Sequence, residues 1–162
     1  MASAASVALL RFRVTVASNP SPSDYKVTQR PRKGFFMSRI AANSPELPQA
    51  GPYSHSIVAG NHIYVSGQLP ISTETGKLVE GGVAEQTEQS LANVARVLKA
   101  SGATMDDIVK CTVFLTDMKD FPVMNKIYAG HFAQPAPARS AFAVVGLPLN
   151  ALVEIEVIAV RN

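Results

Sequence analysis

The C-terminal run Leu152–Val160 constrains the fold more than any other segment, because its residues alternate as they do in a β-strand. One set of alternate positions is entirely apolar, and the other carries Glu154 and Glu156 among apolar neighbours. Burying an unpaired charge costs several kcal/mol, so charges on such a strand are normally paired or used. The run therefore predicts a strand that is largely apolar on both faces and carries two carboxylates on one of them.

A third charge lies in the strand-like run Ala138–Val145, where Arg139 occupies the second position. Its guanidinium presents a planar fork that matches a carboxylate through two hydrogen bonds. We expect Arg139 and the glutamates to lie on neighbouring strands and to form a small site for an anion and a water molecule. An internal salt bridge from Arg139 to Glu154 or Glu156 is the alternative, and the pattern alone does not choose between the two.

The rest of the pattern predicts a small sheet and two helices. Apolar residues recur every three or four positions over Val83–Ser101, as they do in a helix with one buried face. The order β-β-α-β-α-β-β predicts an α+β domain with both helices on one face of a mixed sheet. The expected strands are Ser54–Ala59, His62–Gln68, Ile108–Thr116, Ala138–Val145 and Ala151–Val160, and the second helix runs from about Asp120 to about Phe132.

Two helices can cover only one face of a sheet of this size. The last strand is apolar on its other face as well, and a bare face would leave a large apolar patch in water. We therefore expect copies of the chain to associate through the uncovered face.

The first 45 residues differ in composition from the rest of the chain. They contain seven basic residues and one acidic residue and are rich in alanine and serine, which is typical of an organelle transit peptide. The start Met1–Ser6 favours a chloroplast over a mitochondrion, and a disordered tail is the alternative. We expect cleavage between Phe36 and Ser44, with 1–45 as the disordered transit peptide and 46–162 as the domain.

The domain itself is mildly acidic and lacks the usual signatures of several protein classes. Residues 46–162 hold eight basic and eleven acidic residues, a net charge of −3, which is unlike a nucleic-acid-binding protein. No run approaches the ~18 apolar residues of a membrane span. The one cysteine, Cys111, is expected to be buried and inert, and the three histidines have no metal-ligand spacing.

Three further positions are candidates for a binding cleft. Tyr53 follows a rigid Gly-Pro pair and is able to project a hydroxyl, although ordinary packing is the commoner role of a tyrosine. Gly67 ends a strand and allows close approach of the backbone to a ligand. Asn125 is a polar residue between apolar positions of the second helix.

Five motifs in this order resemble the RidA family (reactive intermediate deaminase A, also called YjgF). The resemblance runs from about Asn43 to Arg161. The motifs are Gly51-Pro52-Tyr53, Val65-Ser66-Gly67-Gln68, Thr112-Val113-Phe114-Leu115, Pro137-Ala138-Arg139-Ser140 and Ile155-Glu156-Val157-Ile158-Ala159.

The resemblance implies a homotrimer of chorismate-mutase-like subunits with three clefts between neighbours. It also implies hydrolysis of reactive enamines and imines, released by pyridoxal-phosphate-dependent threonine or serine dehydratases, to 2-oxo acids and ammonia. In this reading Arg139 binds the substrate carboxylate, Glu154 positions or activates water, and Tyr53, the Gly67 backbone and Asn125 line the cleft. No metal or cofactor is implied.

Some relatives place a cysteine two positions after the arginine, where this chain has Ala141, so a thiol-dependent mechanism is not available there. Two other functions compete with the deaminase. One is an endoribonuclease or translation inhibitor, and the other is a small-metabolite-binding, chaperone-like protein.

Overall fold

The computed structural model describes residues 38–161, which form a mixed sheet and two helices. The predicted element order is confirmed, with one additional strand in front of it. The strands are β1 (Arg39–Ala42), β2 (Ser56–Ala59), β3 (His62–Gln68), β4 (Ile108–Leu115), β5 (Ala138–Ala143) and β6 (Val153–Val160), and the helices are α1 (Val83–Ala100) and α2 (Phe121–Ala129).

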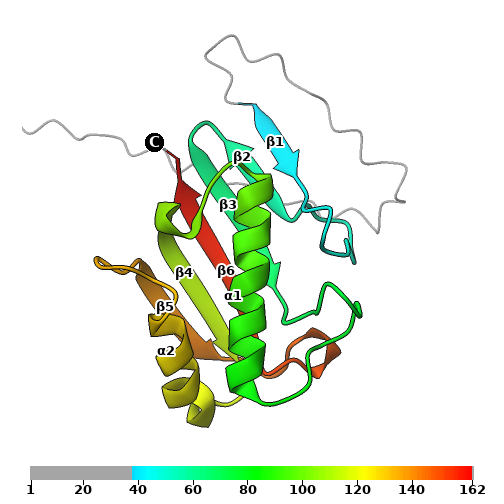
Figure 1. The fold of residues 1–162 in the computed structure, drawn as a ribbon, viewed down its shortest axis with the longest axis vertical. Helices are drawn as coiled ribbons and strands as arrows, with labels where there is room; N and C mark the ends of the chain where they lie inside the picture. Colours follow the sequence, from blue (N-terminus) through cyan, green and yellow to red (C-terminus); the bar gives the residue numbers. More distant parts are fainter. Residues whose placement is uncertain (1–37, 162) are drawn as a thin grey trace, which may run out of the picture. The chain divides into compact units, whose positions relative to one another are not determined.

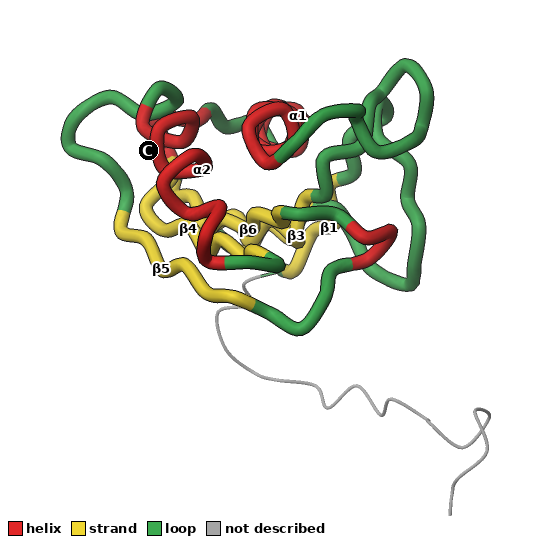
Figure 2. Tube along the Cα trace, turned by 90° about the horizontal axis from the view of Figure 1, so that it is seen from below, coloured by secondary structure: helices red, strands yellow, loops and turns green. Residues whose placement is uncertain are grey.

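The six strands are ordered β1-β2-β3-β6-β4-β5, so the last strand of the sequence lies near the middle of the sheet (Figure 1). Neighbouring strands are antiparallel except β4 and β5, which are parallel and are connected through α2. Both helices lie on the same face of the sheet, as predicted (Figure 2). The sheet is therefore covered by helices on one face only.

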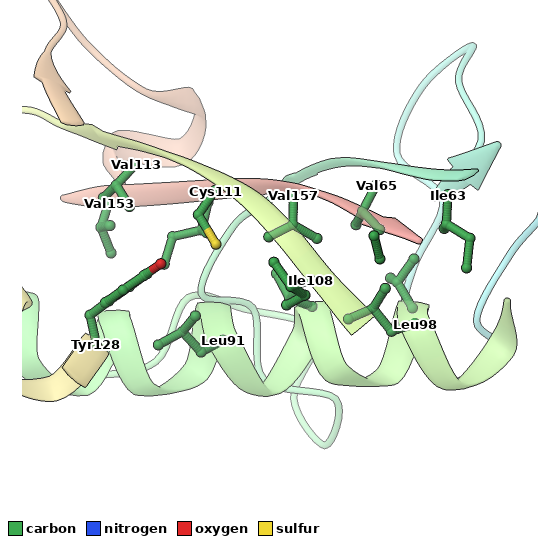
Figure 3. Close-up of a cluster of buried hydrophobic side chains, with 14 of the residues drawn as sticks. Ile63, Val65, Leu91, Leu98, Ile108, Cys111, Val113, Tyr128, Val153 and Val157 are labelled. Carbon is green, nitrogen blue, oxygen red and sulfur yellow. The ribbon is translucent and has the colours of Figure 1, made fainter. Parts of the chain in front are cut away.

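The core fills the space between this helix layer and the sheet. Alternate residues of β6, including Val153, Ile155 and Val157, are buried against the helices, as their period of two requires. Leu91 and Leu98 of α1 are fully buried against them (Figure 3). The strand and helix periodicities that are visible in the sequence thus meet in one cluster.

The opposite face of the sheet is open in the single chain. It carries the other residues of β6, and cross-strand pairing adds Tyr64 beside Ile158 and Phe114 beside Glu154. Tyr64 and Phe142 are 47% and 53% exposed. This face, which we call the open face, is defined by Tyr64, Thr112, Phe114, Phe142, Glu154, Glu156 and Ile158.

Several element boundaries differ from prediction by one to three residues, and one strand was not predicted. That strand, β1, begins at Arg39 and pairs with β2. The second helix ends at Ala129 instead of about Phe132, because Gly130 caps it and the chain then leaves toward Pro135.

Candidate active site

A cavity of about 520 Å³ lies where β3 ends and β6 begins, and it brings together three of the predicted site residues. Tyr53, Gly67 and Glu154 all line it. Its other lining residues come from the segment before β2, from the end of β3, from α1 and from the turn before β6: Leu47, Pro48, Ala50, His55, Ser66, Gln68, Leu69, Ile71, Asn93, Pro148 and Leu149. The cavity is thus walled mainly by apolar side chains, with Glu154 as its acid.

Glu154 lies against the backbone of Gly67 on the adjacent strand. A Cβ atom at residue 67 would lie 2.7 Å from Cδ of Glu154 and 3.0 Å from its Cγ, which is too close. The glycine therefore makes room for the carboxylate. Burial, followed by repulsion from Glu156, raises the pKa of Glu154, so this carboxyl binds a proton more readily than a solvated glutamate.

His55, to which the sequence assigned no role, holds the cavity wall formed by residues 43–53. Its imidazole is buried, and Nδ1 accepts a hydrogen bond from the backbone N–H of Ser44 at 3.1 Å. Nε2 then carries the proton and faces the carbonyl oxygen of Pro48 at 3.3 Å. The backbone N–H of His55 donates to Oδ1 of Asn43 at 2.8 Å. These bonds fix the segment that carries Leu47, Pro48 and Tyr53.

Asn93 holds the opposite wall, and sequence reasoning also missed it. This residue is 1% exposed, and its Nδ2 donates to the carbonyl oxygens of Leu69 and Ile71, both at 2.9 Å. The only signal in the sequence was an amide directly beside Val94, a position of the apolar stripe of α1. An amide can satisfy two buried carbonyls at once, which explains why a polar residue is buried here.

Arg139 lies elsewhere, between β5 and α2. Its Nη2 donates to Oδ1 of Asn125 at 2.7 Å. The guanidinium carbon is 4.4 Å from the ring centroid of Tyr128 and 5.5 Å from that of Phe121. Asn125 thus contacts Arg139, and neither residue lines the cavity of Glu154.

The expectation that Arg139 and Glu154 lie on neighbouring strands is wrong. Strand β4 lies between β5 and β6, and the two side chains leave the sheet on opposite faces. Arg139 is in register with the buried Cys111 and faces the helices, whereas Glu154 alternates with the core residues of β6 and faces away. The alternative of an internal salt bridge is also wrong, because among residues 38–161 no carboxylate lies within 4 Å of Arg139.

Two further titratable side chains, Cys111 and His131, lie outside this cavity. Cys111 is fully buried, and burial raises the pKa of its thiol, as expected for an inert cysteine. His131 pairs with Glu88 at 2.9 Å and links α2 to α1. Within the described part of the chain, no three His, Cys, Asp or Glu side chains cluster as metal ligands, and no helix is long and apolar enough to cross a membrane.

The fold and these motifs match known proteins over nearly the whole domain. The model of the family Endoribonuclease L-PSP matches residues 43–161. Reactive Intermediate Deaminase A, chloroplastic, of Arabidopsis thaliana is 51% identical over 124 residues, which cover 76% of this chain and 66% of that protein. The 2-iminobutanoate/2-iminopropanoate deaminase of Bos taurus is 45% identical over 127 residues, which cover 78% of this chain and 93% of that protein.

Solved structures agree with this assignment. The crystal structure of E. coli TdcF with bound serine is 36% identical, covers 76% of this chain and 99% of its own, and has a TM-score of 0.72. This likeness confirms the expected chorismate-mutase-like α+β fold. The chain therefore belongs to the Endoribonuclease L-PSP family, the RidA family that its motifs predicted.

Proposed function

We propose that this protein hydrolyses 2-aminoacrylate, 2-iminopropanoate and 2-iminobutanoate to 2-oxo acids and ammonia. The observation that carries the proposal is a pair of charged groups with no partner of opposite charge among the described residues. Arg139 has no carboxylate partner, and Glu154 is a partly desolvated carboxylate in a cavity. An anionic imino acid and a water molecule supply what the two groups lack. The names of the Arabidopsis and bovine relatives support this chemistry.

We propose further that the site is completed by a second subunit of a homotrimer. Within one chain Arg139 and Glu154 face opposite sides of the sheet, so one substrate cannot reach both in the same subunit. The open face carries Tyr64, Phe114, Phe142 and Ile158 together with Glu154, and its uncovered apolar side chains make it the natural surface for a neighbouring copy. Arg139 lies on β5, the edge strand of the sheet, so at the rim of this interface Arg139 and Asn125 of one subunit face Tyr53, Gly67 and Glu154 of the next.

The reaction needs few groups because an imine carbon is already electrophilic, and the enamine 2-aminoacrylate becomes the imine 2-iminopropanoate when a proton leaves its nitrogen and another binds its terminal carbon. Arg139 binds the carboxylate and Glu154 takes a proton from water while the water oxygen bonds to the imine carbon. The C=N electron pair moves to nitrogen, which receives that proton and gives a carbinolamine. The hydroxyl proton then passes to nitrogen, the C–N bond breaks as the carbonyl forms, and ammonia leaves. Orientation supplies much of the acceleration in such a site.

The substrates place the protein beside pyridoxal-phosphate-dependent threonine and serine dehydratases, which release such enamines. Removing these intermediates protects pyridoxal-phosphate enzymes and supports branched-chain amino-acid synthesis. The basic, acid-poor residues 1–45 and the word chloroplastic in the name of the Arabidopsis relative favour a chloroplast, with the mitochondrion as the alternative. The expected transit peptide lies largely outside the described residues.

The test is a threonine dehydratase reaction in which ammonia release is followed with and without the protein. We expect faster release with the wild type and loss of most of this effect in Arg139→Lys, because lysine has no planar fork. Arg39→Lys is the matched control, since Arg39 is an exposed residue of β1 that does not line the cavity. Unchanged ammonia release with the wild type contradicts the proposal.

The same preparations also test the two rival functions. RNA cleavage that is lost in Arg139→Ala would favour the endoribonuclease that gives the family its name. Normal deaminase activity of Arg139→Ala would instead favour a binding or chaperone-like role. The mildly acidic domain supports neither RNA binding nor a nuclease site.

A further inference from the structure

One face of α2 holds the side chain of Arg139. Phe121, Asn125 and Tyr128 are spaced four and three residues apart, so they share the side of the helix that faces β5. All three contact the guanidinium: Asn125 accepts one hydrogen bond, and the two aromatic rings lie within 5.5 Å of its central carbon. These distances lie within the range in which a cation is attracted to an aromatic ring.

Tyr128 is the rigid member of this set. Its side chain is 5% exposed, and its ring packs against Phe132 with a centroid separation of 4.5 Å. Its hydroxyl is directed toward the fully buried Cys111 (Figure 3). Burial, together with the contact to Cys111, raises the pKa of Tyr128, so the ring stays neutral and retains its attraction for a cation. The ring is thus fixed by the core before any ligand arrives.

The choice of aromatic partners has a consequence for binding. A carboxylate beside Arg139 would fix the guanidinium but would compete with an anionic ligand for the same fork. Aromatic rings attract the cation through their faces and leave its charge and most of its N–H donors available. A long side chain that is already ordered loses less rotamer freedom when it binds a ligand.

We propose that Tyr128, assisted by Phe121, is a positioning residue that holds the Arg139 guanidinium in the orientation needed to receive a substrate carboxylate. The kinetic consequences of this inference rest on the proposed deaminase function. The contact of the two aromatic rings with the guanidinium, which we call the clamp, does not depend on that function. Tyr128 is predicted to act through its ring and not through its hydroxyl.

The kinetic test compares Tyr128→Phe with Tyr128→Leu on 2-iminobutanoate. We expect Tyr128→Phe to keep KM within about twofold, and Tyr128→Leu to raise KM about five- to tenfold with a smaller change in kcat. Leu98→Ala is the control for loss of core packing, because Leu98 lies at the opposite end of the buried cluster from Tyr128 (Figure 3). It should lose stability and leave KM unchanged.

Phe121→Leu guards against a Tyr128→Leu protein that does not fold, because Phe121 is only partly buried. Its ring is farther from the guanidinium, so we expect a two- to threefold rise in KM. A folded Tyr128→Leu or Phe121→Leu protein with wild-type KM would overturn the inference.

A second measurement does not need deaminase activity. In NMR spectra of the full chain, the Nε–Hε signal of Arg139 is assigned by its loss in Arg139→Lys. We expect the ring current of Tyr128 to shift this signal away from the chemical shift of a solvated arginine. The shift should be kept in Tyr128→Phe and reduced in Tyr128→Leu. A signal at the solvated position in the wild type refutes the clamp. Absence of ammonia formation by the wild type, with the shift present, refutes only the proposed function.

Discussion

Replacing Gly67 with alanine should lower the activity of this protein strongly and leave its free energy of unfolding nearly unchanged. The new Cβ atom would lie 2.7 Å from Cδ and 3.0 Å from Cγ of Glu154, closer than side chains pack. The clash involves the end of a flexible side chain and no backbone, so the carboxylate is expected to swing aside while the strand stays in place.

The expected change is small for the free energy of unfolding and large for kcat. An off-rotamer glutamate costs roughly 0.5–1.5 kcal/mol, and alanine in place of glycine inside a strand recovers roughly 0.5–1 kcal/mol. The free energy of unfolding should therefore change by less than about 1 kcal/mol. A displacement of about 1 Å of a catalytic group costs on the order of 100-fold in rate, so kcat should fall about 100-fold.

The assay is ammonia release from 2-iminobutanoate, with urea denaturation on the same samples. Gly146→Ala is the matched control, because a Cβ atom there meets no atom within 4 Å and the residue has no positive φ. It should keep wild-type activity. A folded Gly67→Ala protein that retains activity within about threefold of wild type would refute the assignment of Glu154 as the water-activating group.

Three further outcomes are expected. Glu154 must be deprotonated to act as a base, so activity should fall as the pH falls through its pKa, which burial and then repulsion from Glu156 raise. Glu156→Gln should therefore move the acid limb of the plot of kcat/KM against pH to lower pH, and an unmoved limb would contradict the repulsion between the two glutamates. Ile158→Glu puts a charge in the middle of the open face and should give monomers in light scattering, whereas an intact trimer would exclude that face as the interface. Asn93→Ala removes two hydrogen bonds that a buried amide donates across the cavity wall, while the Leu69 and Ile71 carbonyls each keep one partner, the backbone N–H of Ile71 and Nε2 of Gln89. It should lower the free energy of unfolding by about 1–2 kcal/mol in urea titrations, and a loss below about 0.5 kcal/mol would show that the Asn93 amide does not hold this wall.

Much of the fold was predictable because its signals are local. The period of two in β6 and the three- and four-residue spacing in α1 depend only on neighbouring residues, and both elements formed where expected. Strand β1 was missed because four residues, Arg39–Ala42, carry no clear alternation. Their strand conformation comes from pairing with β2.

The sequence named five candidate site residues, but it did not predict their arrangement. Tyr53, Gly67 and Glu154 do meet at one cavity, and Asn125 contacts Arg139. His55 and Asn93 were missed because their partners are backbone groups of other segments, which no sequence pattern reveals. The aromatic ring beneath Arg139 was visible only as an apolar position of α2.

The sequence by itself determined which charges are unusual, since Arg139, Glu154 and Glu156 stand in strands where an unpaired charge is costly. It also determined that the sheet has one uncovered face, because two helices cannot cover both. Only the tertiary structure decided where the charges point. Strand β4 inserts between β5 and β6, and the register of β5 turns Arg139 toward the helices while the pleat of β6 turns Glu154 away. Strand order and register depend on contacts between distant segments, so no local pattern specifies them.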